Sequence, residues 1–199
     1  MREKLGDWTD KKPLKKGFAI FGWCTFLMGE IVLVFMIVAL YLLVSLFWPL
    51  ITGGACYTPT PRYRIAQAMD IAGVSSKDVF YDLGCGAGSS LVQAKKRGAK
   101  VVGVEVEPLR WLVSKLRVRG GKVLMRDMFK VSLTDATVIF IFQYPNVNER
   151  LKRKFEKELK SGTKIVSYVW EMEGWKPIKS AGNLHLYVFG ESNTVNQRR

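Results

Sequence analysis

The stretch "YDLGCGAGSS", Tyr81–Ser90, decides the fold that the sequence predicts. It places three glycines within five residues, directly after an apolar run typical of a β-strand. A glycine-rich loop between a strand and the next helix lets a ligand approach the backbone, because no β-carbon stands in the way. Such a loop also directs free amides toward a ligand near the helix N-terminus. By itself, the loop is equally consistent with a tight strand-to-helix turn.

Strand-like and helical patterns alternate around this loop. The strand-like runs are residues 77–84, 100–107, 122–127, 136–144, 163–171 and 184–191. The runs with helical spacing are residues 61–74, 89–99, 108–120 and 146–162. Alternation at this pitch predicts an α/β domain with a doubly wound, Rossmann-like parallel sheet and helices on both of its faces.

Acidic residues stand at the ends of the next two predicted strands. Glu105 ends "VVGVE", 19 residues after Gly86, where a carboxylate can accept hydrogen bonds from both hydroxyls of a ribose. Asp127 ends "LMRD", on the same edge of a parallel sheet. Together with the glycine loop, these two positions predict a nucleoside-binding crevice.

The order of residues in the loop distinguishes between two nucleoside cofactors. Ser89 occupies the last position of the dinucleotide fingerprint G-x-G-x-x-G, and Asp82 stands two residues before Gly84. A carboxylate at this place would repel a pyrophosphate, whereas it would attract the ammonium group of S-adenosylmethionine (SAM). The spacing therefore favours SAM over NAD.

Longer stretches resemble a known enzyme family. "VFYDLGCGAGSS" followed by "VVGVEVE" is similar to the first two motifs of the class I, seven-strand SAM-dependent methyltransferases. "YTPTP", "NVNERLKRKFEKELKSGTKIVS" and "GWKP" resemble the archaeal protein lysine methyltransferases. They also resemble the membrane-anchored mitochondrial methyltransferases that act on lysines of the ATP synthase c-subunit and the adenine nucleotide translocase. The resemblance covers residues 57–191 and implies a protein-lysine N-methyltransferase.

The resemblance implies a role for each matching residue. The methionine part of SAM would be held by Asp82, Gly84, Cys85, Gly86 and Gly88. Glu105 would hold the ribose, and Asp127 would face the adenine with Met128 or Phe129 against the ring. The segment "YTPTP" resembles the pre-methyltransferase motif, whose residues Tyr57, Thr60 and Pro61 would close over the cofactor. The glycine loop departs from many members of the family at Ala87, where they have Asp, and at Ser89, where they often have Arg.

The end of the fourth predicted strand, "FQYPN", offers a place for a lysine side chain. Methyl transfer is an in-line displacement, and an ordinary lysine with a pKa near 10.4 is almost fully protonated at neutral pH. Aromatic walls from Phe142 and Tyr144 would lower that pKa and accept a methylated ammonium. The amide oxygens of Gln143 and Asn146 would orient the amine. Phe142 fits a plain core position equally well, and Trp170 is a weaker candidate for the same wall.

A long apolar run precedes the predicted domain. Residues 17–51 contain one charged residue, Glu30, and the uncharged residues 31–51 would form a helix of about 31 Å, which matches the bilayer core. The alternatives are a core helix and a signal peptide, for which Cys56 after small residues is a weak sign. We expect an N-terminal transmembrane helix and the following order: basic flank 1–16, membrane anchor 17–51, linker and pre-methyltransferase motif 52–60, methyltransferase domain 61–191, polar tail 192–199.

Charge and cysteine content limit the partners. Residues 52–199 hold 25 Lys and Arg against 13 Asp and Glu, which favours an anionic membrane surface. Charge alone also fits nucleic acid, but an anchored domain already has a polyanion beside it, so we expect no nucleic-acid partner. The three cysteines have no metal-ligand spacing, which predicts neither a metal site nor a disulfide framework, and the only histidine, His185, is expected to be structural.

The substrate and the membrane orientation stay open at this level. A lysine-bearing membrane protein is expected, with a lipid headgroup amine, a quinone-type ring or a non-catalytic SAM-binding module as alternatives. Six Lys and Arg precede the anchor, whereas residues 52–71 contain only Arg62 and Arg64, so the positive-inside rule would export the domain. The need for SAM instead places the domain on the cytoplasmic side. Either the rule fails, or residues 17–51 form a shallow hairpin.

Overall fold

The computed structural model describes residues 15–52 and 58–191, which fall into two units divided between Phe47 and Trp48. The described part of the first unit belongs to helix α1 (Lys15–Thr52), which is 38 residues long and therefore about 57 Å. The helix is continuous from Lys15 to Thr52, so a hairpin over residues 17–51 is wrong. Within the described residues, one segment, Phe26–Val44, is long and apolar enough to cross a membrane, a property that signal sequences and core helices share.

A seven-stranded mixed sheet forms the second unit, in the order β3-β2-β1-β4-β5-β7-β6. Its strands are β1 (Val79–Leu83), β2 (Lys100–Glu105), β3 (Lys122–Met125), β4 (Val138–Ile141), β5 (Lys164–Tyr168), β6 (Lys179–Ala181) and β7 (Leu184–Val188). The first five strands are parallel, whereas β7 runs antiparallel to both β5 and β6. The prediction of a parallel sheet is therefore wrong for β7, which runs against all its neighbours, and the edge strand β6 was not among the predicted strands. A two-residue turn at 182–183 joins β6 to β7, and so short a connection permits only an antiparallel pair.

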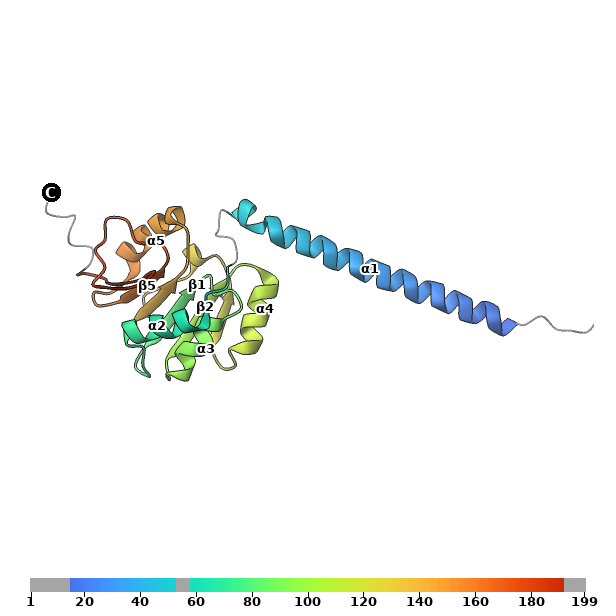
Figure 1. Cartoon of the computed structure of the whole chain (residues 1–199), viewed down its shortest axis with the longest axis horizontal. Helices are drawn as coiled ribbons and strands as arrows, with labels where there is room; N and C mark the ends of the chain where they lie inside the picture. Colours follow the sequence, from blue (N-terminus) through green and yellow to red (C-terminus); the bar gives the residue numbers. More distant parts are fainter. Residues whose placement is uncertain (1–14, 53–57, 192–199) are drawn as a thin grey trace, which may run out of the picture. The chain divides into compact units, whose positions relative to one another are not determined.

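Helices cover both faces of the sheet, as a doubly wound fold requires (Figure 1). Side chains of β1 alternate between the faces: Phe80 packs with α2 (Arg62–Ala72) and α3 (Ser89–Lys96), while Leu83 packs with α5 (Pro145–Glu158). Helix α4 (Pro108–Arg117) lies on the same face as α3, since its Ser114 is buried against the glycine loop. The apolar face of each strand is thereby removed from water, the main stabilising contribution to such a domain.

Several strands end earlier than their sequence pattern indicates. Strand β4 ends at Ile141 because Tyr144 is already the N-cap of α5, with Pro145 in the first turn. Strand β5 ends at Tyr168 because the next residue, Val169, has a φ of 72°. Asp127 does not end β3; it caps the short 3-10 helix η1 (Met128–Lys130). Residues that were predicted on strands are thus placed in loops at the carboxyl edge of the sheet.

Candidate functional site

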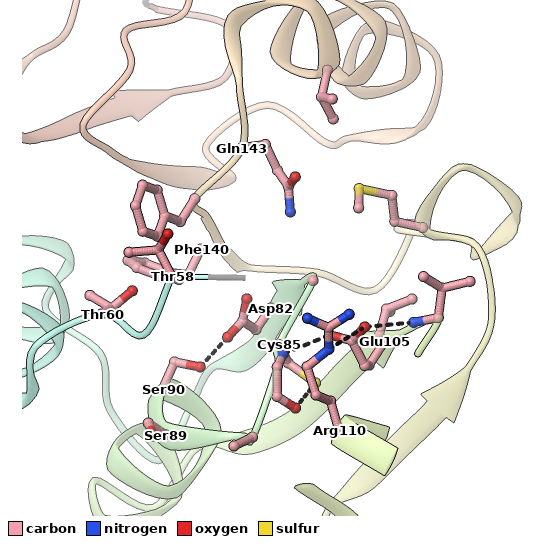
Figure 2. Close-up of a pocket in the computed structure, with 18 of the residues that line it drawn as sticks. Thr58, Thr60, Asp82, Cys85, Ser89, Ser90, Glu105, Arg110, Phe140 and Gln143 are labelled. Carbon is pink, nitrogen blue, oxygen red and sulfur yellow. Dashed lines mark hydrogen bonds and ion pairs between the residues drawn. The ribbon is translucent and has the colours of Figure 1, made fainter. Parts of the chain in front are cut away.

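A cavity of about 380 Å³ opens at the carboxyl ends of β1, β2 and β4 (Figure 2). In an open α/β sheet, ligands bind outside these ends, at the point where neighbouring strands connect to opposite sides; β1 and β4 form that point here. The volume lies within the range of small-molecule sites. The predicted site residues that line the cavity are Thr60, Asp82, Gly84, Cys85, Gly86, Glu105, Asp127, Met128, Phe142, Gln143 and Tyr144, together with Phe129 and Trp170.

Three predicted site residues do not line this cavity. Gly88 is the N-cap of α3, and a β-carbon there would collide with the Ser114 hydroxyl of α4, so this glycine permits helix packing. Pro61 is the N-cap of α2, where its carbonyl accepts from two backbone amides of the first turn. Asn146 lies exposed in the first turn of α5. A fourth predicted residue, Tyr57, lies outside the described residues.

The glycine loop is fixed from two sides. Gly84 has a φ of 89°, and a β-carbon there would collide with the side-chain amide of Gln143. That amide in turn donates to the carbonyl of Leu83 at 3.0 Å, which ties the β4–α5 junction to the end of β1. On the other side, the amide of Gly86 donates to Glu105 Oε2 at 2.8 Å. The loop therefore needs glycine for packing as well as for access to a ligand.

Glu105 is a clamp at the end of β2. Its Oε1 accepts from the backbone amides of Val106 and Glu107, both at 3.0 Å, while its Oε2 accepts from Gly86. The guanidinium of Arg110 also lies 3.8 Å from Oε1. A carboxylate has about four lone-pair positions, so three backbone bonds leave about one, on Oε2, for a ligand.

Asp82 and Cys85 are both deeply buried beside the loop (Figure 2). Burial raises the pKa of Asp82 to about 7; a hydrogen bond from the Ser90 hydroxyl opposes this shift, and the negative charge of Glu105 adds to it. Asp82 is thus close to half-ionised at neutral pH, and a cation beside it would favour the ionised form. Burial also raises the pKa of the Cys85 thiol, so the thiol stays neutral and can contribute packing but not nucleophilic chemistry.

Four aromatic rings form a wall beside the cavity. The rings of Phe142 and Tyr168 meet edge to face with centroids 4.8 Å apart, and those of Tyr144 and Trp170 do so at 6.4 Å. Tyr144 and Trp170 are 41% and 39% exposed, so they form the part of the wall that is open to solvent. Val169, between two of these aromatics, has the only positive φ of any described non-glycine residue, a strained conformation for a β-branched side chain.

The cavity also contains residues that the sequence did not single out. The hydroxyl of Ser90, in the first turn of α3, reaches back to Asp82. Three arginines, from α4, the β3–η1 segment and α5, line the cavity: Arg110, Arg126 and Arg150. Arg150 lies over the ring of Phe129 at 3.9 Å. No local pattern marks these residues, because the three elements meet only in the folded domain. Thr58 and Pro59 extend the predicted contribution of the "YTPTP" segment.

Comparisons with known proteins place the chain in a family. The ANTKMT methyltransferase domain matches residues 82–179, which begin at the buried aspartate of the cavity and include its aromatic wall. A protein-lysine N-methyltransferase of Saccharolobus islandicus is 40% identical over 151 residues, which cover 68% of this chain and 94% of that protein. The chain belongs to the SAM-dependent protein-lysine methyltransferase family. The family resemblance that the sequence indicated is thereby confirmed.

Two further relatives of this methyltransferase define the extent of the similarity. The mouse lysine N-methyltransferase of the ATP synthase C-subunit is 29% identical over 109 residues, which cover 51% of this chain but only 43% of that enzyme. An RNA methyltransferase of Salinibacter ruber, solved with S-adenosylhomocysteine (SAH), has a TM-score of 0.65 and 27% identity, with coverage of 67% of this chain and 95% of that one. SAM is therefore the cofactor. Residues 15–52 and 58–191 contain no group of three His, Cys, Asp or Glu side chains able to hold a metal ion.

Proposed function

We propose that this methyltransferase transfers methyl groups to lysines of membrane proteins and that α1 anchors it in the bilayer. The observation that carries the proposal is the surface of α1. Its described side chains between residues 26 and 44 are apolar apart from Glu30, and all are exposed except the half-buried Tyr41. A helix that is apolar all round requires apolar surroundings, and this one has the length to find them in a bilayer.

In this proposal, one end of the cavity binds SAM and the other end binds the substrate lysine. SAM, when bound, would supply a sulfonium-linked methyl group that a neutral amine can accept, with SAH as the leaving group. Asp82 offers a carboxylate to the ammonium of the cofactor, and the remaining lone pair of Glu105 offers an acceptor to its ribose. At the other end, Tyr144 and Trp170 shield the lysine from water and so favour its neutral, nucleophilic form. Gln143, whose nitrogen is held by the Leu83 carbonyl, keeps its oxygen as an acceptor for that amine.

A small membrane molecule remains the alternative substrate, either a lipid headgroup amine or a quinone-type ring. The decisive experiment incubates the full chain, methyl-tritiated SAM and membranes, and then separates protein from organic extract. Label in a protein band that yields methyllysine on hydrolysis supports the proposal, and label confined to the organic phase contradicts it. The variant Asp82→Asn serves as the control for background transfer, since it removes the charge for the cofactor without a change in side-chain size.

Membrane anchoring is tested in the full chain by two charges placed in the middle of the span. Ile37→Arg combined with Leu40→Arg should release the protein from membranes, because each arginine costs about 2.5–3.5 kcal/mol at the centre of a bilayer helix. The matched control combines Ile37→Met with Leu40→Met, which keeps the span apolar. The arginine variant should still methylate a soluble lysine peptide but lose most of its rate on membrane proteins. Retention of the arginine variant in the membrane fraction after an alkaline wash would contradict an anchor.

The side of the membrane follows from the cofactor. We propose that the catalytic domain faces the cytoplasmic, SAM-containing side, although the basic residues before α1 favour the opposite orientation. In sealed vesicles with their cytoplasmic face outward, added protease should then digest the domain without detergent. Protection of the domain in such vesicles would show that the positive-inside rule holds here.

A further inference from the structure

Helix α4 presents its apolar side to solvent. Leu109, Leu112, Val113 and Leu116 recur at the spacing of one helical stripe, yet they are between 37% and 66% exposed. The side of α4 that faces the sheet instead carries Ser114, the only buried residue of the helix. In α5, by contrast, the residues of the apolar stripe are fully buried. The stripe of α4 therefore contributes nothing to the core of this domain.

The stripe continues onto the neighbouring strand ends. Val106, directly after β2, is 39% exposed, and Met125 at the end of β3 is 54% exposed. Met125 is paired with Glu105, the residue before Val106, so Val106 and Met125 belong to adjacent strand ends. We call the whole surface the α4 patch; it consists of Val106, Leu109, Leu112, Val113, Leu116 and Met125. Figure 1 shows α4 beside α3 in the helical layer.

All exposed charges of the segment that carries the α4 patch have one sign. Between residues 106 and 126, the only acid is Glu107, which is buried because its side chain caps α4. The exposed charged residues of this segment are Lys115, Arg117, Arg119, Lys122 and Arg126. An apolar stripe bordered by Lys and Arg is the pattern of helices that lie in the interface of an anionic bilayer.

We propose that the α4 patch docks on the anionic surface of the membrane that holds α1. The inference rests on the proposed function for the presence of that membrane. Residues 52–61 are the only chain between the uncharged run and α2, and ten extended residues reach at most about 36 Å. The domain therefore stays close to the headgroups. A second copy of the chain fits less well, because a symmetric contact would bring like-charged borders together.

Docking of the α4 patch would place the cavity at the level of the headgroups. Val106 belongs to the patch and Arg126 to its basic border, and both residues also line the cavity. A lysine that projects a short distance from the bilayer would then meet the aromatic wall, whereas a lysine far from the surface would not. The patch thus selects substrates by the height of the lysine above the membrane.

Lipid contact is measured in the full chain, with Cys24 and Cys56 replaced by Ser and the buried Cys85 retained. An environment-sensitive dye is attached through Leu116→Cys, or through Ile178→Cys as a control that is also exposed, at 52%. Vesicles of phosphatidylcholine and phosphatidylglycerol carry nitroxide-labelled lipids. We expect strong quenching at position 116 and little at 178. Equal quenching at both positions would overturn the proposal. Blue-shifted but unquenched emission at position 116 would also overturn the proposal. If that emission depends on protein density, a second copy of the chain covers the patch; if it does not, another part of the same chain covers it.

The effect on catalysis provides a second, independent readout. Leu112→Glu combined with Leu116→Glu should slow methylation of a bilayer-anchored lysine peptide by about tenfold or more, and should change the rate on a soluble peptide by less than about twofold. Ile178→Glu should change neither rate. Equal losses on both peptides would overturn the proposal. Wild-type protein that methylates neither peptide would refute the proposed function, and the quenching experiment would still decide the role of the α4 patch.

Discussion

The affinity for SAH should rise with pH, because the buried Asp82 titrates near neutrality. Its pKa of about 7 arises mainly from burial, and only the ionised carboxylate attracts the ammonium of the ligand. With this pKa, about one-eleventh of the free protein is ionised at pH 6 and about three-quarters at pH 7.5. The dissociation constant of SAH should therefore fall by about eightfold over this interval.

Titration calorimetry in two buffers with different ionisation enthalpies measures both the affinity and the proton balance. At pH 6, binding should release close to one proton per ligand, and at pH 7.5 only a small fraction of one. Asp82→Asn should bind more weakly and show a flat profile between these pH values. A flat profile in the wild-type protein, or the same slope in the Asn variant, would refute the assignment of the titration to Asp82.

The same shift makes a prediction about stability. The folded-state pKa of Asp82 lies above the ordinary value of 3.8, so the folded protein binds this proton more tightly than the unfolded chain does. The contribution of Asp82 to the free energy of unfolding therefore falls as the pH rises from about 4 through about 7. The melting temperature of the wild type, relative to that of Asp82→Asn, should decrease between pH 5 and pH 7.5, and SAH should offset that decrease. A constant difference between the two proteins would contradict the raised pKa.

Three further predictions concern the backbone and the aromatic wall. Gly84→Ala should lower the free energy of unfolding and weaken SAH binding in titrations. Gly162 has a similar positive φ but nothing within 4 Å of a β-carbon, so Gly162→Ala should show only the backbone strain, about 1–3 kcal/mol by urea unfolding. Val169→Gly should relieve backbone strain and leave the free energy of unfolding unchanged or higher. It should also raise KM for a lysine peptide, because Trp170 is held less firmly. A clear loss of stability would contradict the strain at Val169. Trp170→Ala should raise KM for the peptide and leave the dissociation constant of SAH unchanged. Equal effects on both quantities would indicate that the Trp170 ring contacts the cofactor rather than the lysine.

Local patterns were sufficient for the part of the site that lies on one strand and its loop. Asp82, Gly84 and Gly86 are neighbours in the chain, so a strand followed by glycines already places them together at a sheet edge. Glu105 ends β2, as predicted. These features depend on residues a few positions apart, and the family resemblance adds the identity of the cofactor.

Contacts between distant segments were beyond the reach of such patterns. The bond from Gly86 to Glu105 shows that the predicted ribose acceptor is largely occupied by backbone amides, which the spacing alone does not reveal. The turn at Val169 shortens β5 although its sequence continues the strand pattern through Trp170. The three residues of β6 carry no apolar pattern at all, because an edge strand is defined by its neighbour rather than by its own side chains.

Helix α4 separates the two kinds of information most clearly. Its sequence by itself determined that a helix would form and that one stripe of the helix would be apolar, since both properties follow from residues three and four positions apart. The same periodicity is found in α5, whose stripe is buried. Only the tertiary structure decided that Ser114 faces the glycine loop and that the leucines face outward. The physical reason is that periodicity specifies which residues share a face, whereas burial depends on what the rest of the chain packs against that face.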